Sequence, residues 1–340
     1  MRSISARRRA LAIAAAAVAC CALIPASASA TITLSNWDAA QQRQVVRAGL
    51  IANVGSSFRG SAALSAAQAN TTLGAVAQRL GLRSTARAHR SPVTVFGFDG
   101  LVITQLGLGD VASHVQKVAV AAGLHPPPYF GSEVVGRFLG LRYNHPTGTD
   151  QLELFATDPI TRAEAAWSLS KVLGSDGWEV SYARQTLDEF ALPTLTGDQL
   201  KALTIAVSRI GYPYVWGGTT DDTSDGLAHG GFDCSGFVWR VFKGSGLSWG
   251  KSIRGRTAAQ QAGEIAKSRR LRISALAPGD LLFFGTAGFG STATESNVTH
   301  EGIYLGDNWV INASSQGVYV EPLTGSWLGD SFAWGRRVIG

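Results

Sequence analysis

Cys234, His300 and Asn312 are the residues of this 340-residue sequence whose types and spacing indicate a reaction. Cys234 follows two glycines and precedes an apolar pattern of helical period, so we expect it in the first turn of a helix. The free N–H groups and the dipole of such a turn favour negative charge, which predicts a lowered pKa for the thiol. The alternative is a buried structural cysteine, the commoner role of a lone cysteine.

His300 and Asn312 lie on two consecutive predicted strands. An odd-length loop centred on Gly306 would place them directly opposite each other on one face, whereas a two-residue turn at Asp307–Asn308 would place them on opposite faces. In the first register the Asn312 carbonyl can accept the imidazole N–H and orient His300 as the base that takes the thiol proton. The alternatives are a structural histidine and a turn or sheet-edge asparagine.

The elements that must position these residues are a helix and several strands. Residues 237, 238, 241 and 242 are apolar at helical spacing after the cysteine, and residues 281–284 are typical of a buried strand. A further helix is expected from about 199 to 210. We therefore predict an α+β domain at residues 198–340.

The preceding residues, 31–190, have a mainly helical pattern. Capping boxes at Ser65–Gln68 and Thr161–Glu164 begin apolar helices that stop at Gly81 and Gly174. Each is preceded by a helical stretch that ends in Ala-Gly-Leu, which indicates an internal duplication.

Residues 1–30 are typical of an export signal, with an arginine-rich start, an apolar run and a small-residue cleavage site at residues 28–30. The apolar run is shorter than the roughly 20 residues of a membrane span. We therefore expect a secreted protein with no stable membrane span after cleavage. Both the general secretory route and, because of Arg8–Arg9, the twin-arginine route stay open.

Cleavage would change the composition in two ways. Cys20 and Cys21 would leave with the signal, so Cys234 would be the lone thiol in an oxidising compartment. Four arginines and no acidic residues would leave with it, so the net charge of +6 would fall to +2. The basic balance therefore gives no evidence for nucleic-acid binding, and we expect no nucleic-acid partner.

Taken together, four motifs of the second half resemble the NlpC/P60 family of papain-like cysteine peptidases: residues 213–218, 232–236, 278–284 and 300–306. The resemblance covers about 200–340. It implies a papain-like fold, in which the cysteine-bearing helix packs on an antiparallel sheet. It also implies hydrolysis of peptidoglycan stem peptides, typically at the bond between D-γ-glutamyl and a diamino acid.

By the same mapping Cys234 would be the nucleophile, His300 the base and Asn312 the orienting residue, although many relatives carry histidine there. Substrate-binding residues would be Tyr214, Asp233 and Ser235. In some relatives the last two meet a free N-terminal L-alanine. The alternative is that Asp233 only caps the helix and Ser235 only fills its first turn.

Residues 158–166 resemble the signature at the end of an S-layer homology module, and residues 65–69 resemble it less closely. This resemblance implies that residues 31–190 anchor the protein to a cell-wall polymer. The alternative is a helical packing region with ordinary caps.

These observations predict an exported peptidoglycan endopeptidase that acts on stem peptides by cysteine nucleophile catalysis. No cofactor is expected, because one thiol and scattered histidines do not form a zinc ligand set. Two alternatives stay open. One is another thiol amidase or acyltransferase on the same fold, and the other is a non-catalytic cell-wall-binding protein with a vestigial triad.

Overall fold

The computed structural model describes residues 38–145, 154–175, 177–220, 230–244, 246 and 248–339. The expected export signal at residues 1–30 lies outside these ranges. Within them, no helix combines the length and the apolar character needed to cross a bilayer.

Seven helices form the first half of the described chain. They are α1 (Ala39–Arg47), α2 (Ala66–Arg79), α3 (Val95–Gln105), α4 (Gly109–Ala121), α5 (Phe130–Phe138), α6 (Arg162–Gly174) and α7 (Trp178–Asp188). The capping box that begins α2 is confirmed, because Ser65 and Gln68 bond reciprocally. The box that begins α6 is only half formed. Thr161 accepts the N–H of Glu164, but the Glu164 carboxylate is bound by Arg142 and His145 instead.

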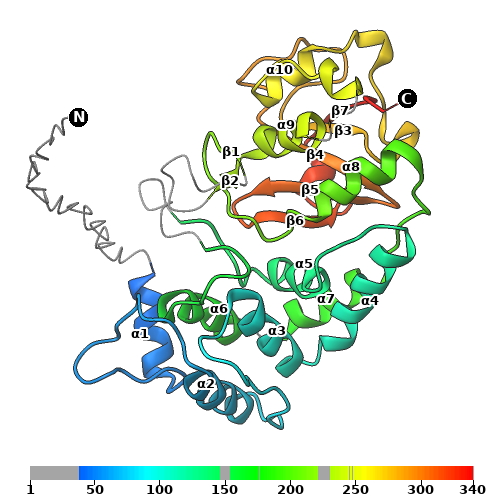
Figure 1. Ribbon diagram of the computed structural model, residues 1–340. Helices are drawn as coiled ribbons and strands as arrows, with labels where there is room; N and C mark the ends of the chain where they lie inside the picture. The colour runs from blue at the N-terminus through cyan, green and yellow to red at the C-terminus, as the bar shows by residue number, and fades with distance from the viewer. Residues whose placement is uncertain are drawn as a thin grey trace, which may run out of the picture. The chain divides into compact units, whose positions relative to one another are not determined.

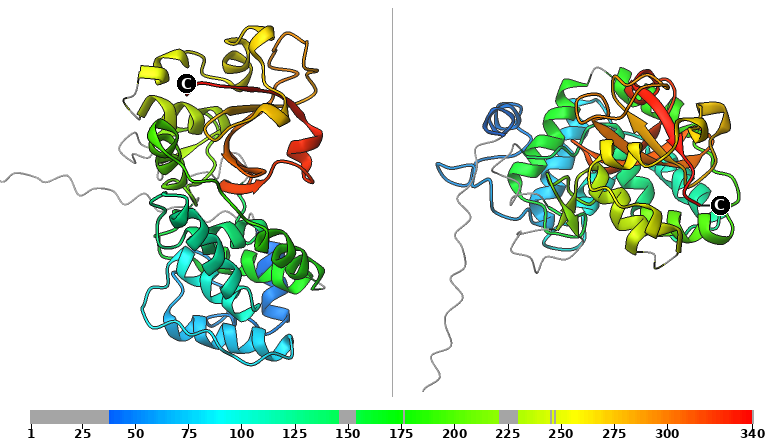
Figure 2. Two further views of the ribbon diagram at one scale, coloured as in Figure 1. Left: turned by 90° about the vertical axis from the view of Figure 1, so that its right-hand side faces the viewer. Right: turned by 90° about the horizontal axis from the view of Figure 1, so that it is seen from above.

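A five-stranded antiparallel sheet forms the centre of the second half. Its strands, β3 (Leu281–Phe284), β4 (His300–Gly306), β5 (Trp309–Ser314), β6 (Gly317–Pro322) and β7 (Phe332–Arg336), lie in the order β6-β5-β4-β3-β7. The helix α9 (Cys234–Gly244) packs against β4 and β5, and α8 (Gly197–Val207) packs on α9 (Figure 1). Figure 2 shows the twist of these strands from two further directions. The α+β fold with a cysteine-bearing helix on an antiparallel sheet is confirmed, whereas the division at 190–198 stays a prediction.

Shorter elements complete this half. They are β1 (Thr219–Thr220), β2 (Gly231–Phe232), the 3₁₀ turns at Ser248–Ser252, Lys267–Arg269 and Ile273–Ala275, α10 (Ala258–Gly263) and α11 (Trp327–Asp330).

The two faces of the sheet have different environments because side chains alternate along each strand. On β4 the odd-numbered residues Ile303 and Leu305 enter the main core beneath α9. On neighbouring strands Leu282, Phe284 and Val310 form a smaller cluster on the other face. His300 pairs with Phe284, which belongs to the smaller cluster. Its side chain therefore lies on the same face of the sheet as that cluster.

The β4–β5 hairpin differs from the expected register. Its turn is at Asp307–Asn308, both with positive φ, and not at a loop centred on Gly306. However, a bulge between Tyr304 and Gly306 adds one residue and restores the parity, so that Gly302 pairs with Asn312. His300 and Asn312 therefore share a face as expected, but as diagonal neighbours and not directly opposite each other.

Candidate functional site

Cys234 is the first residue of α9, as the sequence predicts. Asp233 caps this helix, because its Oδ1 accepts the N–H of Gly236 at 2.6 Å. Gly236 is required by close approach, since a Cβ at this position would collide with the carbonyl oxygen of Gly218. The apolar face of α9 is fully buried, and this fixes the position of its first turn.

His300 and Asn312 form the expected hydrogen bond, with 3.0 Å between His300 Nε2 and Asn312 Oδ1. Asn312 Nδ2 in turn donates to Glu321 Oε1 at 3.1 Å. That bond fixes the amide orientation, so Oδ1 faces the ring and Nε2 must be the donor. In the neutral imidazole, Nδ1 is then left as an acceptor.

Gly302 makes the diagonal contact between His300 and Asn312 possible. It pairs with Asn312, and a Cβ on it would lie 3.0 Å from Asn312 Cβ and 2.8 Å from Val310 Cγ1. A side chain at this position would therefore crowd Asn312, the hydrogen-bond partner of His300.

Glu321 is the centre of a buried polar network that the sequence did not reveal. Besides Asn312, Tyr319 donates its hydroxyl to Oε1 at 2.6 Å, and Trp327 donates Nε1 to Oε2 at 3.1 Å. The ring of Trp327 also lies 5.2 Å from that of His300, centroid to centroid. The alternating pattern of a third strand, 317–322, is the signal that could have placed Glu321 on the face of Asn312.

One groove of about 620 Å³ contains most of the predicted site residues. It is lined by Cys234, His300, Tyr214, Asp233 and Ser235. Asn312 lies behind His300 and is fully buried, as an orienting residue would be. The structure thus brings all six predicted residues together, in the groove or directly behind it.

The electrostatics of the groove differ from the expectation of a stabilised thiolate. Burial raises the pKa of the Cys234 thiol to about 12, and the carboxyls of Glu301 and Asp233 act in the same direction. The backbone N–H groups of Glu301 and Ser235 lower it only in part. Burial also lowers the pKa of His300 to about 4. The expected low thiol pKa is therefore wrong for the unliganded protein, in which desolvation outweighs the helix dipole and the resting pair is neutral.

Asp233 has a second partner that the sequence analysis missed. Arg256 binds both carboxylate oxygens, with distances of 3.0 Å from Nη1 to Oδ1 and 2.8 Å from Nη2 to Oδ2. Its Nη1 also donates to Ser235 Oγ at 2.9 Å. Asp233 therefore both caps α9 and forms an ion pair at the edge of the groove. No sequence signal marked Arg256 beyond its place just before a helix cap at Thr257.

Glu301 is an unexpected buried acid next to His300 on β4. It points to the α9 face, and neither of its carboxyl oxygens has a hydrogen-bond partner among the described residues. Burial raises its pKa well above the ordinary value of 4.5. Within the described ranges, no group of three or more metal-ligating side chains occurs.

The cysteine-bearing helix on an antiparallel sheet, with a thiol and an imidazole in one groove, agrees with the papain-like fold that the sequence resemblance implies. Residues 211–337 match the NlpC/P60 family, and the chain thus contains an NlpC/P60 domain.

Two curated relatives from Bacillus subtilis are similar to this chain. One is named probable peptidoglycan endopeptidase LytE and is 35% identical over 140 residues, which are 41% of this chain and 33% of the relative. The other is named bifunctional muramidase/DL-endopeptidase CwlT and is 34% identical over 132 residues, which are 38% and 34% of the two chains. The chain therefore spans about a third of the length of these relatives.

A solved structure of an NlpC/P60 family protein from Bacillus cereus is 26% identical. The match covers 45% of this chain and 43% of that protein, with a TM-score of 0.32.

Proposed function

We propose that this protein is an exported peptidoglycan endopeptidase that cleaves the bond between D-γ-glutamyl and a diamino acid in stem peptides. The observation that carries the proposal is the His300–Asn312 hydrogen bond behind a groove that also contains Cys234. The names of the two Bacillus subtilis relatives support the substrate class.

In the proposed mechanism, the Cys234 thiol transfers its proton to His300 Nδ1 as the sulfur attacks the carbonyl carbon. Transfer during attack suits the neutral resting pair, because neither group is charged before substrate binds. The oxyanion is met in part by the backbone N–H of Cys234. The imidazolium then protonates the leaving amine as the C–N bond breaks, and water hydrolyses the thioester through the same base.

Asn312 holds the ring in the tautomer that this mechanism needs, and Glu321 holds Asn312. Tyr214, Asp233 and Ser235 would contact substrate. However, Arg256 occupies both oxygens of Asp233, so a substrate amine would have to compete with a guanidinium for this carboxylate. We therefore infer that the Asp233–Arg256 pair presents a nearly neutral polar surface to the stem peptide.

Digestion of purified muropeptides followed by mass spectrometry tests this proposal. The expected products are two fragments separated at the D-γ-glutamyl bond, formed by the wild type but not by Cys234→Ala or His300→Ala. Cleavage that persists in Cys234→Ala would refute cysteine catalysis. Cleavage of a different amide would instead indicate another amidase or acyltransferase on the same fold.

The second candidate is a non-catalytic wall-binding protein. The raised pKa of Cys234, to about 12, favours it, because a neutral buried thiol is a poor nucleophile. It predicts that the wild type binds muropeptides but releases no fragments from them, even at high enzyme concentration and long incubation.

A wall-anchoring role for residues 31–190 is a separate proposal. Residues of the S-layer-like signature, such as Ile160, Arg162 and Glu164, are buried, which favours a packing role for the motif itself. A wall polymer would then have to bind elsewhere on this half. Failure of these residues to pellet with purified cell walls would count against anchoring.

A further inference from the structure

Asn144 belongs to the helical half but lies in the catalytic groove. It lines the groove together with Ser314 and Ser315, on the same cavity as Cys234 and His300. Its backbone N–H donates to the carbonyl of Ser315, at the β5–β6 turn, at 2.6 Å. Among the described lining residues, Asn144 is the only one that precedes the NlpC/P60 domain.

The amide of Asn144 is available to a ligand. Within the described part of the chain its side chain makes one long hydrogen bond, 3.4 Å from Nδ2 to the carbonyl of His145. Oδ1 can therefore accept an N–H while Nδ2 donates to a carbonyl, and this pair of groups matches a peptide backbone. The neighbouring Ser314 and Ser315 make this end of the groove polar but uncharged, unlike the Asp233–Arg256 end.

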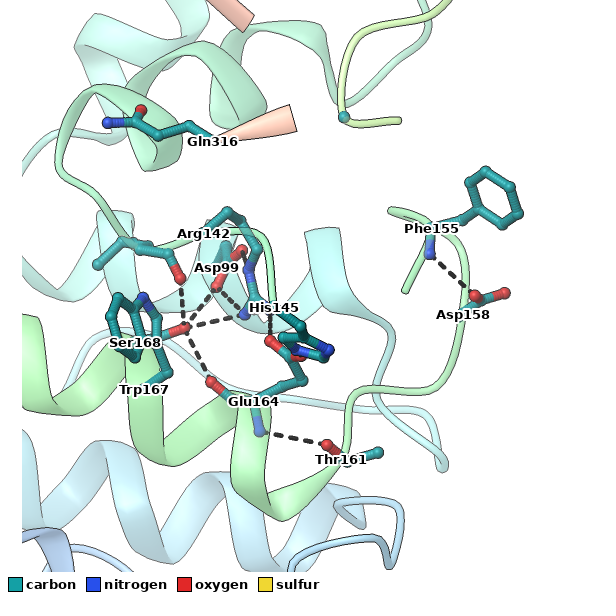
Figure 3. Close-up of polar contacts among 12 residues, drawn as sticks. Asp99, Arg142, His145, Phe155, Asp158, Thr161, Glu164, Trp167, Ser168 and Gln316 are labelled. Carbon is teal, nitrogen blue, oxygen red and sulfur yellow. Dashed lines mark hydrogen bonds and ion pairs between the residues drawn. The ribbon is translucent and has the colours of Figure 1, made fainter. Parts of the chain in front are cut away.

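A buried ionic cluster fixes Arg142 and His145, which lie two residues before and one residue after Asn144. Arg142 binds Asp99 through two bonds of 2.6 and 3.0 Å and Glu164 through one of 2.8 Å. His145 Nε2 lies 2.5 Å from the other oxygen of Glu164. Figure 3 shows Arg142 between the two acids, with the ring of His145 beside Glu164. Asn144 is thus presented by a segment held on either side.

The turn that receives Asn144 is also held from the helical half. Arg137 on α5 donates Nη2 to the carbonyl of Gly211 at 2.9 Å and Nη1 to the carbonyl of Gln316. Its own charge is paired with Glu133 at 2.8 Å. Buried ion pairs of this kind often stabilise a fold no better than apolar packing would. We therefore explain the cluster by the position in which it holds the chain around Asn144.

We propose that Asn144 is a substrate-binding residue supplied by the helical half, and that Glu164 is the positioning residue that holds it. The ligand would be the peptide backbone of the stem peptide, and the inference rests on the proposed function. It also gives the S-layer-like signature a role: the acid of its half-formed capping box holds one wall of the groove.

The test compares Asn144→Ala, Glu164→Gln and the double variant in the full chain with the wild type. Gln78→Ala is the control, because it truncates an exposed amide on α2. We measure kcat and KM on a disaccharide–tetrapeptide muropeptide, the dissociation constant of that muropeptide in a Cys234→Ala background, melting temperature, and alkylation by iodoacetamide. Loss of one substrate hydrogen bond predicts a rise of roughly two- to tenfold in KM and in the dissociation constant.

Asn144→Ala should retain the kcat and the alkylation rate of the wild type within about a factor of two. This is the result expected when the lost hydrogen bond is equally strong in the bound ground state and in the transition state. Glu164→Gln should raise KM in a similar way, and the double variant should add little to it. Unchanged KM and dissociation constant in Asn144→Ala would overturn the inference and leave the proposed function intact. Weaker binding with no cleavage even by the wild type would support the inference while refuting the proposed function. Absence of any muropeptide binding would overturn both.

Discussion

Replacing Glu321 with glutamine tests the network behind His300 most directly. The Glu321 carboxylate accepts three donors, from Asn312, Tyr319 and Trp327, at 3.1, 2.6 and 3.1 Å. A glutamine has one oxygen and one NH₂ group, so at least one donor must face another donor. If the Asn312 amide rotates to avoid this conflict, it turns its NH₂ toward His300 Nε2. The ring must then accept there, and Nδ1 loses the lone pair needed to take the thiol proton.

The size of this effect follows from the lost charge-assisted bond. Such bonds contribute about 1.5–3 kcal/mol, so we expect kcat on muropeptides to fall about 10- to 150-fold. Tyr319→Phe is the matched control, since it removes one donor and leaves the Asn312–Glu321 bond in place, and its loss should be clearly smaller. An E321Q variant with the melting temperature and kcat of the wild type would refute this account of how His300 is oriented.

The pH profile gives a second measurement on the same variant. Burial raises the pKa of Glu321 above its ordinary 4.5, although its three donors act in the opposite direction. Protonation of this carboxyl should imitate E321Q, so wild-type activity should fall as the pH drops through the raised pKa. E321Q should lack this limb and retain only the one from His300, whose pKa is about 4.

Three further predictions concern single groups. Because the pKa of Cys234 is about 12, its alkylation by iodoacetamide in the unliganded protein should keep accelerating from pH 6 to 10, and a plateau near neutrality would reveal a preformed thiolate. Gly302→Ala should lower both activity and stability, by about 1–3 kcal/mol in chemical unfolding, because the new methyl would meet Val310 and Asn312; wild-type values in both assays would contradict the packing. The raised pKa of Glu301 contributes stability below pH 4.5 that is lost as the pH rises through the raised pKa, so Glu301→Gln should match the wild type near pH 4 and be about 1–3 kcal/mol more stable above that pKa; a difference that does not change with pH would exclude this cause.

The local features of the site could be predicted because short segments determine them. Cys234 begins its helix where the glycines end and the apolar period starts, and Asp233 caps it. The strand at residues 281–284 has the predicted bounds, because a continuous apolar run between turn residues leaves few alternatives. The predicted strand that carries His300 is also present, and it begins at this residue.

The features that the sequence did not reveal depend on contacts between distant segments. Arg256 reaches Asp233 across 23 residues, and Glu164 reaches Arg142 across 22. Neither pair leaves a local pattern, because the two partners of each pair lie far apart in the sequence. The prediction of a lowered pKa for the Cys234 thiol was wrong for the same reason. The helix dipole can be inferred from nearby residues, but the burial that outweighs it depends on the whole domain.

The bulge at Leu305 decides which side chains of β4 meet Asn312. A two-residue turn at Asp307–Asn308 without a bulge would pair Asn312 with Ile303, and His300 would then lie on the opposite face, beneath α9. Glu301 would in turn face Asn312. One inserted residue therefore selects the imidazole over the carboxyl as the partner of Asn312, and it leaves the carboxyl buried under the helix that carries Cys234. The buried acid and the oriented base are two consequences of the same irregularity in one strand.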